Sequence, residues 1–451
     1  MKQEVKHTTR FYAVLAMAGF LCLSGPAFAQ SSQTDAPKRQ PAVTHPKVGR
    51  ELSTDRMQVT FVGRKQQFSA SDKASFDQDI QSPKSVNIHP SGKKYYVNSL
   101  EGGRTVVYDF RTGDKLKVIS HKFGEGDRSL WARPSGLYTF HHHYDHPDTF
   151  TGKPVESTFT HGGRYLWVPY YRRSFDLNAQ DPSAMAVIDT EKDEIIRLFE
   201  TGPLPKMVAV SPDGTRLAVT HWGDNTVGLM DISSNRPEDW HYLKNLVVDY
   251  QLKLNFSLTQ SVNRDVNSGY CLRGTVFTPD NRYLFVGCMG GGGGIAVIDL
   301  KDNVYLGRVM GAMSNLRHLV IRNGFLFASI NSAGYVQRIP LAKFLDACSS
   351  LDGKNTKTVR VDGWVSCKVG AGARTIDLSP DGRFIFAACN FASCLAVVDA
   401  QSMKLLGTIP ADSFPVGLDV SRDGRYVFTT SQARSGIGGG NAVDIFEITY
   451  K

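Results

Sequence analysis

The chain has 451 residues, of which 52 are lysine or arginine and 43 are aspartate or glutamate, so its formal net charge is +9. This excess of positive charge favours anionic partners but identifies none of them. No C-x-x-C-H motif occurs, which argues against covalently bound c-type haem, and we expect no cofactor.

The first 29 residues have the pattern of a secretory signal peptide. A basic start is followed by an apolar run from Phe11 to Leu23 and by the small-x-small ending Ala27-Phe28-Ala29. The apolar run is too short for a membrane anchor. We therefore predict cleavage before Gln30 and a bacterial-type exported protein, located in the periplasm, in the medium or at the cell surface.

Residues 30–54 are rich in proline, serine and charge, which predicts a flexible polar linker. After the linker, hairpin turns recur along the chain, and each is followed by an apolar strand, a loop and a further strand. The seven turns lie at residues 91–92, 162–163, 212–214, 279–281, 323–324, 380–382 and 422–424. Strands of this length at this spacing indicate an all-β repeat architecture.

A four-stranded antiparallel unit that occurs seven times predicts an all-β fold, a seven-bladed β-propeller over residues 55–451. The last repeat ends after its third strand, at Lys451. We therefore predict that residues 57–63, with the sequence MQVTFVG, supply the fourth strand of the last blade and join the two ends of the ring.

One repeat carries a family resemblance. The segment TRLAVTHWGDNTVGLMDIS at 215–233, preceded by PLPKMVAVSPDG, resembles the YVTN β-propeller repeat. The chain after the signal peptide is similar to bacterial exported YVTN-repeat proteins of the YncE-like family. It departs from the repeat at residues 121–156, 171–183, 249–270 and 341–358. The resemblance implies the propeller fold but no single function, because such propellers serve many roles.

Basic residues recur at one position of the repeat, eight residues before the end of the turn. The residues at this position are Lys84, Val155, Lys206, Arg273, Arg374 and Val416, with Arg317 in the repeat that has a shorter turn. Because first strands are innermost and all begin on one face, the top face, these five cations are expected to ring the top opening of the central channel. The alternative is that they pair with carboxylates of adjacent blades, for which Asp377 and Asp419 are available.

Further candidate residues belong to loops and strand ends on the same face. They are Arg172 and Arg173 in the loop 171–181, Arg434 in the loop 431–440, and Asn98, Tyr170 and His221 at the ends of second strands. The glycine run at 290–294 is expected to be a turn, although its backbone amides could also serve an anion. His221 has a structural alternative, as a hydrogen-bonded residue of its blade.

The connection between the first two blades contains the histidine-rich segment HHHYDHPDTF at 141–150. In an extended run His141 and His143 point the same way, His142 points the other way, and His146 could fold back to form a zinc-type site. Metal sites need a rigid shell and a second layer of hydrogen bonds. We therefore expect a polar lid here and assign no metal site.

Six cysteines follow the predicted signal peptide, and an even number in an exported chain suggests disulfides. Six cysteines allow 15 pairings. We choose the sequence-local set, because each bridge would close a hairpin or an insertion. The predicted pairs are Cys271 with Cys288, Cys348 with Cys367, and Cys389 with Cys394.

The function predicted from these features is the binding of an anionic ligand, such as an acidic glycan or a phosphorylated envelope component, in a basic funnel on the top face. Nucleic acid is a weaker choice, because strand-binding sites interleave cations with aromatic platforms. A second hypothesis is a lyase or hydrolase that acts on an acidic saccharide, with His221, Tyr144 or Tyr170 moving a proton. A third is a protein-interaction scaffold. We expect a monomer with no membrane span.

Overall fold

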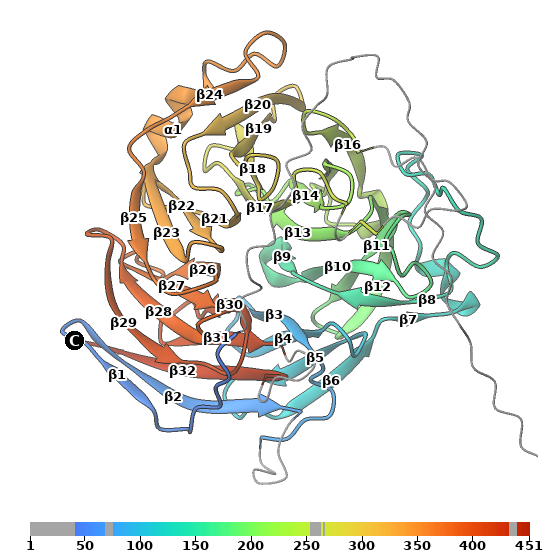
Figure 1. The fold of residues 1–451 in the computed structure, drawn as a ribbon. Helices are drawn as coiled ribbons and strands as arrows, with labels where there is room; N and C mark the ends of the chain where they lie inside the picture. Colours follow the sequence, from blue (N-terminus) through green and yellow to red (C-terminus); the bar gives the residue numbers. More distant parts are fainter. Residues whose placement is uncertain (1–40, 68–74, 253–262, 265–266, 433–439) are drawn as a thin grey trace, which may run out of the picture. The chain divides into compact units, whose positions relative to one another are not determined.

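The structure is a computed structural model that describes residues 41–67, 75–252, 263–264, 267–432 and 440–451. These residues form seven antiparallel blades of four strands in a β-propeller ring (Figure 1), which confirms the predicted fold class. The predicted signal peptide, residues 1–29, and the candidate residue Arg434 lie outside the described residues. In the part of the chain that is described, no helix has the length and apolar character needed to cross a membrane.

Three blades are each made of four strands that follow one another in the sequence. Blade 1 is β3 (Pro83–Ile88), β4 (Lys94–Ser99), β5 (Arg104–Asp109) and β6 (Lys115–Ser120). Blade 3 is β13 (Pro205–Val210), β14 (Arg216–His221), β15 (Thr226–Asp231) and β16 (His241–Val247). Blade 6 is β26 (Ala373–Leu378), β27 (Phe384–Cys389), β28 (Cys394–Asp399) and β29 (Lys404–Pro410). In each blade the first strand faces the channel and the fourth forms the rim.

Blades 2, 4 and 5 carry the insertions. Blade 2 is β9 (Thr158–Thr160), β10 (Tyr165–Arg173), β11 (Ser183–Asp189) and β12 (Glu194–Thr201), and β10 also pairs with β8 (Phe150–Pro154), which pairs with β7 (Lys122–Phe123). Blade 4 is β17 (Leu272–Phe277), β18 (Tyr283–Cys288), β19 (Ile295–Asp299) and β20 (Val304–Met310), with β24 (Thr358–Arg360) parallel to β20. Blade 5 is β21 (Leu316–Arg322), β22 (Phe325–Ile330), β23 (Tyr335–Pro340) and β25 (Val365–Lys368).

Blade 7 joins the two ends of the chain, as predicted. Its strands are β30 (Pro415–Val420), β31 (Tyr426–Ser431), β32 (Ala442–Tyr450) and, from the N-terminal side, β2 (Met57–Gln66). β2 pairs with β32 over its whole length, from Met57 opposite Tyr450 to Gln66 opposite Ala442. Alternate residues of β2, including Phe61, are buried, because one face packs on the neighbouring blade.

Part of the predicted linker has a defined place in the structure. Residues Glu51–Ser53 form β1, which pairs with β2 at the rim of blade 7. Upstream of β1, Thr44 exchanges hydrogen bonds with the Ser413 side chain, and Arg64 donates to the carbonyl of Pro46 at 2.9 Å. The sequence did not indicate these contacts, because Thr44 and Ser413 are 369 positions apart and Pro46 and Arg64 are 18 positions apart.

Within the described residues, four helices interrupt the strands. They are η1 (Glu125–Leu130), η2 (His161–Gly163), η3 (Pro237–Asp239) and α1 (Leu341–Cys348). α1 lies in the insertion 341–358 and buries Leu341, Phe344 and Cys348. These side chains join the apolar cluster between blades 4 and 5. The insertion therefore covers the outside of these two blades.

All six cysteines after the predicted signal peptide are buried free thiols in the structure, so the three predicted disulfides are not seen. Cys389 and Cys394 are directly opposite each other in the β27–β28 hairpin, and the interaction of their thiols raises the pKa of Cys389 and lowers that of Cys394. Cys348 instead packs in the cluster between blades 4 and 5, whereas Cys367 packs between blades 5 and 6. The structure thus brings together the partners of the Cys389–Cys394 pair but separates Cys348 from Cys367.

Candidate functional site

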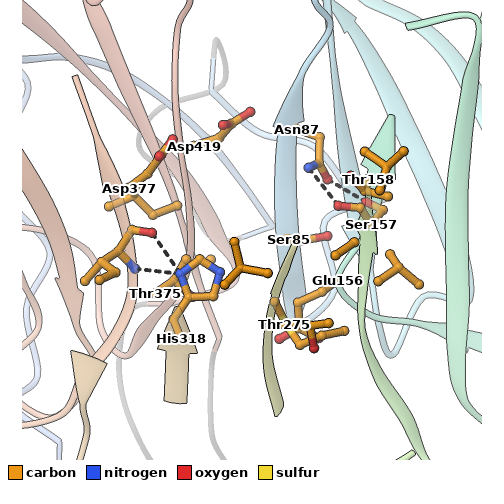
Figure 2. A pocket seen from close by; sticks show the side chains of 18 of the residues that line it. Ser85, Asn87, Glu156, Ser157, Thr158, Thr275, His318, Thr375, Asp377 and Asp419 are labelled. Carbon is orange, nitrogen blue, oxygen red and sulfur yellow. Dashed lines mark hydrogen bonds between the residues drawn. The ribbon is translucent and has the colours of Figure 1, made fainter. Parts of the chain in front are cut away.

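A cavity of about 560 Å³ lies in the central channel and is lined by the inner strands of all seven blades (Figure 2). Its polar lining includes Ser85, Asn87, Glu156, Thr275, His318 and Asp419. A second cavity of about 490 Å³ shares Asn87, Thr158 and Asp419 with the first and reaches Arg422 beside the bottom turns. The channel therefore runs from Glu156 toward the bottom face.

Basic side chains gather around Glu156 at the upper end of this channel. The Nζ of Lys84 in blade 1 lies 2.9 Å from Glu156 Oε1, and an Nη of Arg273 in blade 4 lies 2.5 Å from the same oxygen. The side chains of Lys84, Glu156 and Arg273 are respectively 6%, 14% and 4% exposed. A single carboxylate oxygen thus bridges two cations that belong to separate blades.

Two more predicted residues, Lys206 and Arg374, belong to this group, because the charges of these side chains shift one another's pKa or that of Glu156. Burial would raise the pKa of Glu156, but the charges of Lys84 and Arg273, followed by that of Arg374, hold it well below its usual value. Burial and the charge of Arg374 lower the pKa of Lys84, while burial and the charge of Arg273 lower that of Lys206. We call Lys84, Lys206, Arg273 and Arg374 the basic cluster.

Aromatic rings hold one member of the basic cluster in place. The ammonium of Lys206 lies 3.6 Å from the ring centroid of Tyr171 and 4.9 Å from that of Trp222. Such cation–π contacts orient a buried ammonium without neutralising its charge. The fifth predicted cation, Arg317, is half-buried, and its charge acts on the buried thiol of Cys271, as do those of Lys206 and Arg273. The structure therefore places Arg317 near the basic cluster.

The carboxyl groups of Asp377 and Asp419 also line the channel. Each lies three residues after the basic position of its repeat, so it is roughly 10 Å below the basic cluster along the inner strand. Figure 2 shows Asp377 and Asp419 side by side, away from Glu156. Asp419 Oδ2 accepts a hydrogen bond from the backbone amide of Ile88 at 2.6 Å, whereas Asp377 Oδ1 accepts one from the amide of Leu378 in its own strand at 2.7 Å. The Asp419 carboxyl group therefore joins blade 7 to blade 1, and both carboxyl groups bond to backbone amides.

The protonation of these groups follows from their burial. Burial raises the pKa of Asp377 to about 6, and burial together with the charge of Asp377 raises that of Asp419 to about 8. Burial lowers the pKa of His318 to about 4, and its Nδ1 lies 2.9 Å from the carbonyl oxygen of Ile376 in the next blade. Near neutral pH, His318 is uncharged and Asp419 carries a proton for much of the time.

Three predicted site residues lie inside the blades instead of in the funnel. Asn98 donates to the Val155 carbonyl at 2.6 Å, and Tyr170 is fully buried with its hydroxyl 2.8 Å from His121 Nδ1. His221 is also fully buried, accepts a hydrogen bond from the Gly202 amide at 3.0 Å, and has a pKa that burial lowers to about 3. Second strands are covered by a neighbouring blade on both faces, so their polar side chains bond within the disc.

Arg172 and Arg173, predicted in a loop, are the last two residues of β10 and also have local roles. Arg173 is 3% exposed, donates to the carbonyls of Pro147 and Ser183, and stacks on aromatic rings. The rings belong to Trp131, Phe140 and Phe150. Arg172 donates to the Leu177 carbonyl and packs over Tyr171. Arg173 therefore attaches the blade 1–2 connection to blade 2, and it is removed from the candidate ligand site.

The glycine run forms a turn, as expected. Gly291, Gly292, Gly293 and Gly294 have φ between 59° and 91°, and a Cβ on Gly291 would come within 2.0 Å of the Tyr270 ring. Arg308 donates to the carbonyl of Gly293 at 2.7 Å and pairs with Asp249. The loop is thus held through its carbonyl oxygens.

The histidine-rich segment does not gather its imidazoles at one point. His142 Nδ1 lies 2.6 Å from Asp181, whereas His143 is 93% exposed and His146 is 61% exposed. Among the residues that the structure describes, no group of three or more His, Cys, Asp or Glu side chains is arranged to hold a metal ion. Tyr144 donates its hydroxyl hydrogen to Asp181 at 2.8 Å, so its proton is committed to a structural contact.

Sequence reasoning missed Glu156, the residue on which the basic cluster converges. It follows Val155, the apolar residue that occupies the basic position of the second repeat. The inner strand of blade 2 is divided here, because β8 ends at Pro154 and β9 begins at Thr158. In the first half of the chain, Val155 is the one residue at the basic position of the repeat that carries no charge, and a glutamate follows it directly. This neighbouring carboxylate could have pointed to Glu156.

Comparison with known proteins supports the fold and nothing finer. No family model matches the chain, and neither does any curated protein. Among solved structures, hydrazine synthase from Kuenenia stuttgartiensis matches with a TM-score of 0.56 and 13% identity, covering 84% of this chain and 99% of that one. The β-propeller domain of Cps50 (Swd1) from Myceliophteria thermophila matches with a TM-score of 0.54 and 11% identity, covering 82% and 98%.

Proposed function

We propose that this protein binds an anionic ligand at the basic cluster at the top of its channel. The observation that supports the proposal is the shared contact of Lys84 and Arg273 with Glu156 Oε1. One carboxylate neutralises one cation, and Lys206 and Arg374 bring further positive charge to the same place. An anion that enters the cluster offsets this excess charge in a partly desolvated site, where the attraction is stronger than in water.

The lowered pKa of each lysine reflects burial and the crowding of positive charge in the same cluster. The pKa of Lys84 and that of Lys206 are both lowered by burial and by neighbouring arginines. A bound anion would favour the charged form of both side chains and raise these pKa values again. Binding of an anion would therefore be accompanied by proton uptake at any pH at which either lysine is partly uncharged in the free protein.

The side chains suit an acidic sugar or a phosphorylated envelope component. An arginine such as Arg273 can form two parallel hydrogen bonds with a carboxylate or a phosphate. The exported location predicted from residues 1–29 would expose the protein to such molecules. The hydrolase or lyase hypothesis loses its proposed proton carriers, because His221 and Tyr170 are enclosed in blades and Tyr144 bonds to Asp181.

Isothermal titration calorimetry with D-glucuronate and with inorganic phosphate tests the proposal. We expect binding of one or both anions, with an affinity that falls as the salt concentration rises, because the contacts are ionic. The Arg273→Gln variant should bind more weakly, whereas Arg111→Gln, which changes an exposed arginine near the bottom of blade 1, should bind as the wild type does. Equal binding by both variants, or no binding of either anion, would reject the proposal.

A further inference from the structure

A separate pocket of about 460 Å³ lies between two segments that depart from the blade repeat. One is the connection from β7 to β8, which runs alongside blade 2 (Figure 1), where Ala132 donates to the carbonyl of Leu198. The other follows β16 and contributes Gln251 and Arg264. Insertions in repeat proteins gather on one face and often form the binding surface. The basic cluster shares no lining residue with this pocket.

The wall that carries His141 is held by a single buried carboxylate. Asp181 is 1% exposed and accepts hydrogen bonds from the His141 amide, from His142 Nδ1 at 2.6 Å and from the Tyr144 hydroxyl at 2.8 Å. The backbone amide of Asp181 in turn donates to Asp176 at 2.8 Å. These contacts hold residues 141–144 of the histidine-rich segment beside Asp181, and His141 lines the pocket.

The floor of the pocket contains two buried charges of opposite sign. Asp224 is 4% exposed and Arg264 is 3% exposed. Asp224 accepts hydrogen bonds from the Thr226 hydroxyl at 2.7 Å and from Gln251 Nε2 at 3.2 Å. Arg264 donates to the Gly223 carbonyl at 3.0 Å, and its backbone amide donates to the Asn178 carbonyl. The floor is thus held in place by both backbone and side-chain contacts.

We infer that this pocket binds an uncharged, hydroxyl-rich ring such as a neutral saccharide. Its carboxylate and guanidinium balance in charge, so the pocket lacks the excess of positive charge that characterises the basic cluster. Asp224 offers acceptors, while the Gln251 amide offers both a donor and an acceptor, and sugar hydroxyls satisfy both because they donate and accept. Leu137, Pro182 and Pro203 provide apolar walls for the carbon face of the ring. The volume lies within the range of small-molecule pockets.

Saturation-transfer-difference NMR with glucose, galactose, mannose and N-acetylglucosamine tests this inference on the full chain. The test variant is H141A/Q251A, since both residues are exposed on the rim of the pocket and their removal leaves the core intact. The control is Gln401→Ala, an exposed residue of a turn in blade 6. Melting temperatures of all variants are measured alongside.

We expect at least one of the four sugars to bind, and H141A/Q251A to weaken its binding by about tenfold or more, because two polar contacts are lost. Gln401→Ala and Arg273→Gln should bind the sugar as the wild type does. Loss of binding in Arg273→Gln would assign the sugar to the basic cluster and overturn the inference. Wild-type binding by H141A/Q251A, or no transfer to any of the four sugars at millimolar concentration, would overturn it as well.

Discussion

Asp419 in the last blade accepts a hydrogen bond from the backbone amide of Ile88 in the first blade, at 2.6 Å. This contact joins the inner strands of blade 7 and blade 1, β30 and β3, whereas the pairing of β2 with β32 closes the outer part of blade 7. Asp377, at the same position one blade earlier, accepts a hydrogen bond from the amide of Leu378 in its own strand at 2.7 Å. The two carboxyl groups that the sequence offered as partners for the basic residues thus bond to backbone amides, and that of Asp419 links two blades.

The position of Asp419 predicts a pH effect on stability. Burial and the charge of Asp377 raise the pKa of Asp419 to about 8, so between its ordinary value and pH 8 the folded protein holds a proton that the unfolded chain has lost. The free energy of unfolding should therefore fall as the pH rises through this range. Asp419→Asn stays neutral and should lose less stability between pH 6 and pH 9.

Thermal unfolding at pH 6 and at pH 9 measures this effect. Asp362→Asn is the matched control, because the Asp362 side chain is 82% exposed. If the melting temperature of Asp419→Asn falls between the two pH values as much as that of the wild type and the control, Asp419 does not hold the proton.

Closure by β2 predicts a large cost for removing one of its buried rings. Phe61 is fully buried, and its ring centroid lies 5.4 Å from that of Phe446 in β32. Phe61→Ala should lower the free energy of unfolding by about 3–5 kcal/mol. The next residue, Val62, is 37% exposed, and Val62→Ala should cost well under half as much. Equal effects of the two changes in a urea titration would contradict closure by this strand.

The cysteines predict a selective oxidation. Directly opposite residues of antiparallel strands have Cα separations of about 4.5–5.5 Å, within the range that a disulfide spans, so Cys389 and Cys394 can bridge without movement of the backbone. Cys348 and Cys367 pack in different clusters and cannot do so. Peptide mapping after mild oxidation should find the first bridge and not the second; a Cys348–Cys367 peptide would contradict the packing.

The fold was predictable because its signals are local. Each Pro-x-Gly or related turn marks one blade, and the missing last strand of the seventh repeat pointed to residues 57–63. The same turns allowed the repeats to be aligned, and the alignment showed that the basic residues share one position of the repeat. The insertions were not predictable in this way, because β24 and α1 depend on contacts with blades 4 and 5 that no repeat encodes.

The site was only partly predictable for a related reason. The repeat alignment placed Lys84, Lys206, Arg273 and Arg374 at one register of the inner strands, but it could not show that Glu156 joins them. Asn98, Tyr170 and His221 were assigned to the top face by their position at strand ends. Their side chains do not face the channel, because each points between blades and forms a hydrogen bond there.

The most direct test of the central claim is the affinity of D-glucuronate for Glu156→Gln. Removing the one carboxylate that Lys84 and Arg273 share leaves a stronger positive field, and a unit charge at about 6 Å in a medium of intermediate dielectric is worth roughly 1–3 kcal/mol. Glu101→Gln, at an exposed ion pair with Lys153, is the matched control. We predict that Glu156→Gln binds the anion at least tenfold more tightly than the wild type and the control. Unchanged or weaker binding by Glu156→Gln, in a protein that melts as the wild type does, would contradict an anion site at the basic cluster.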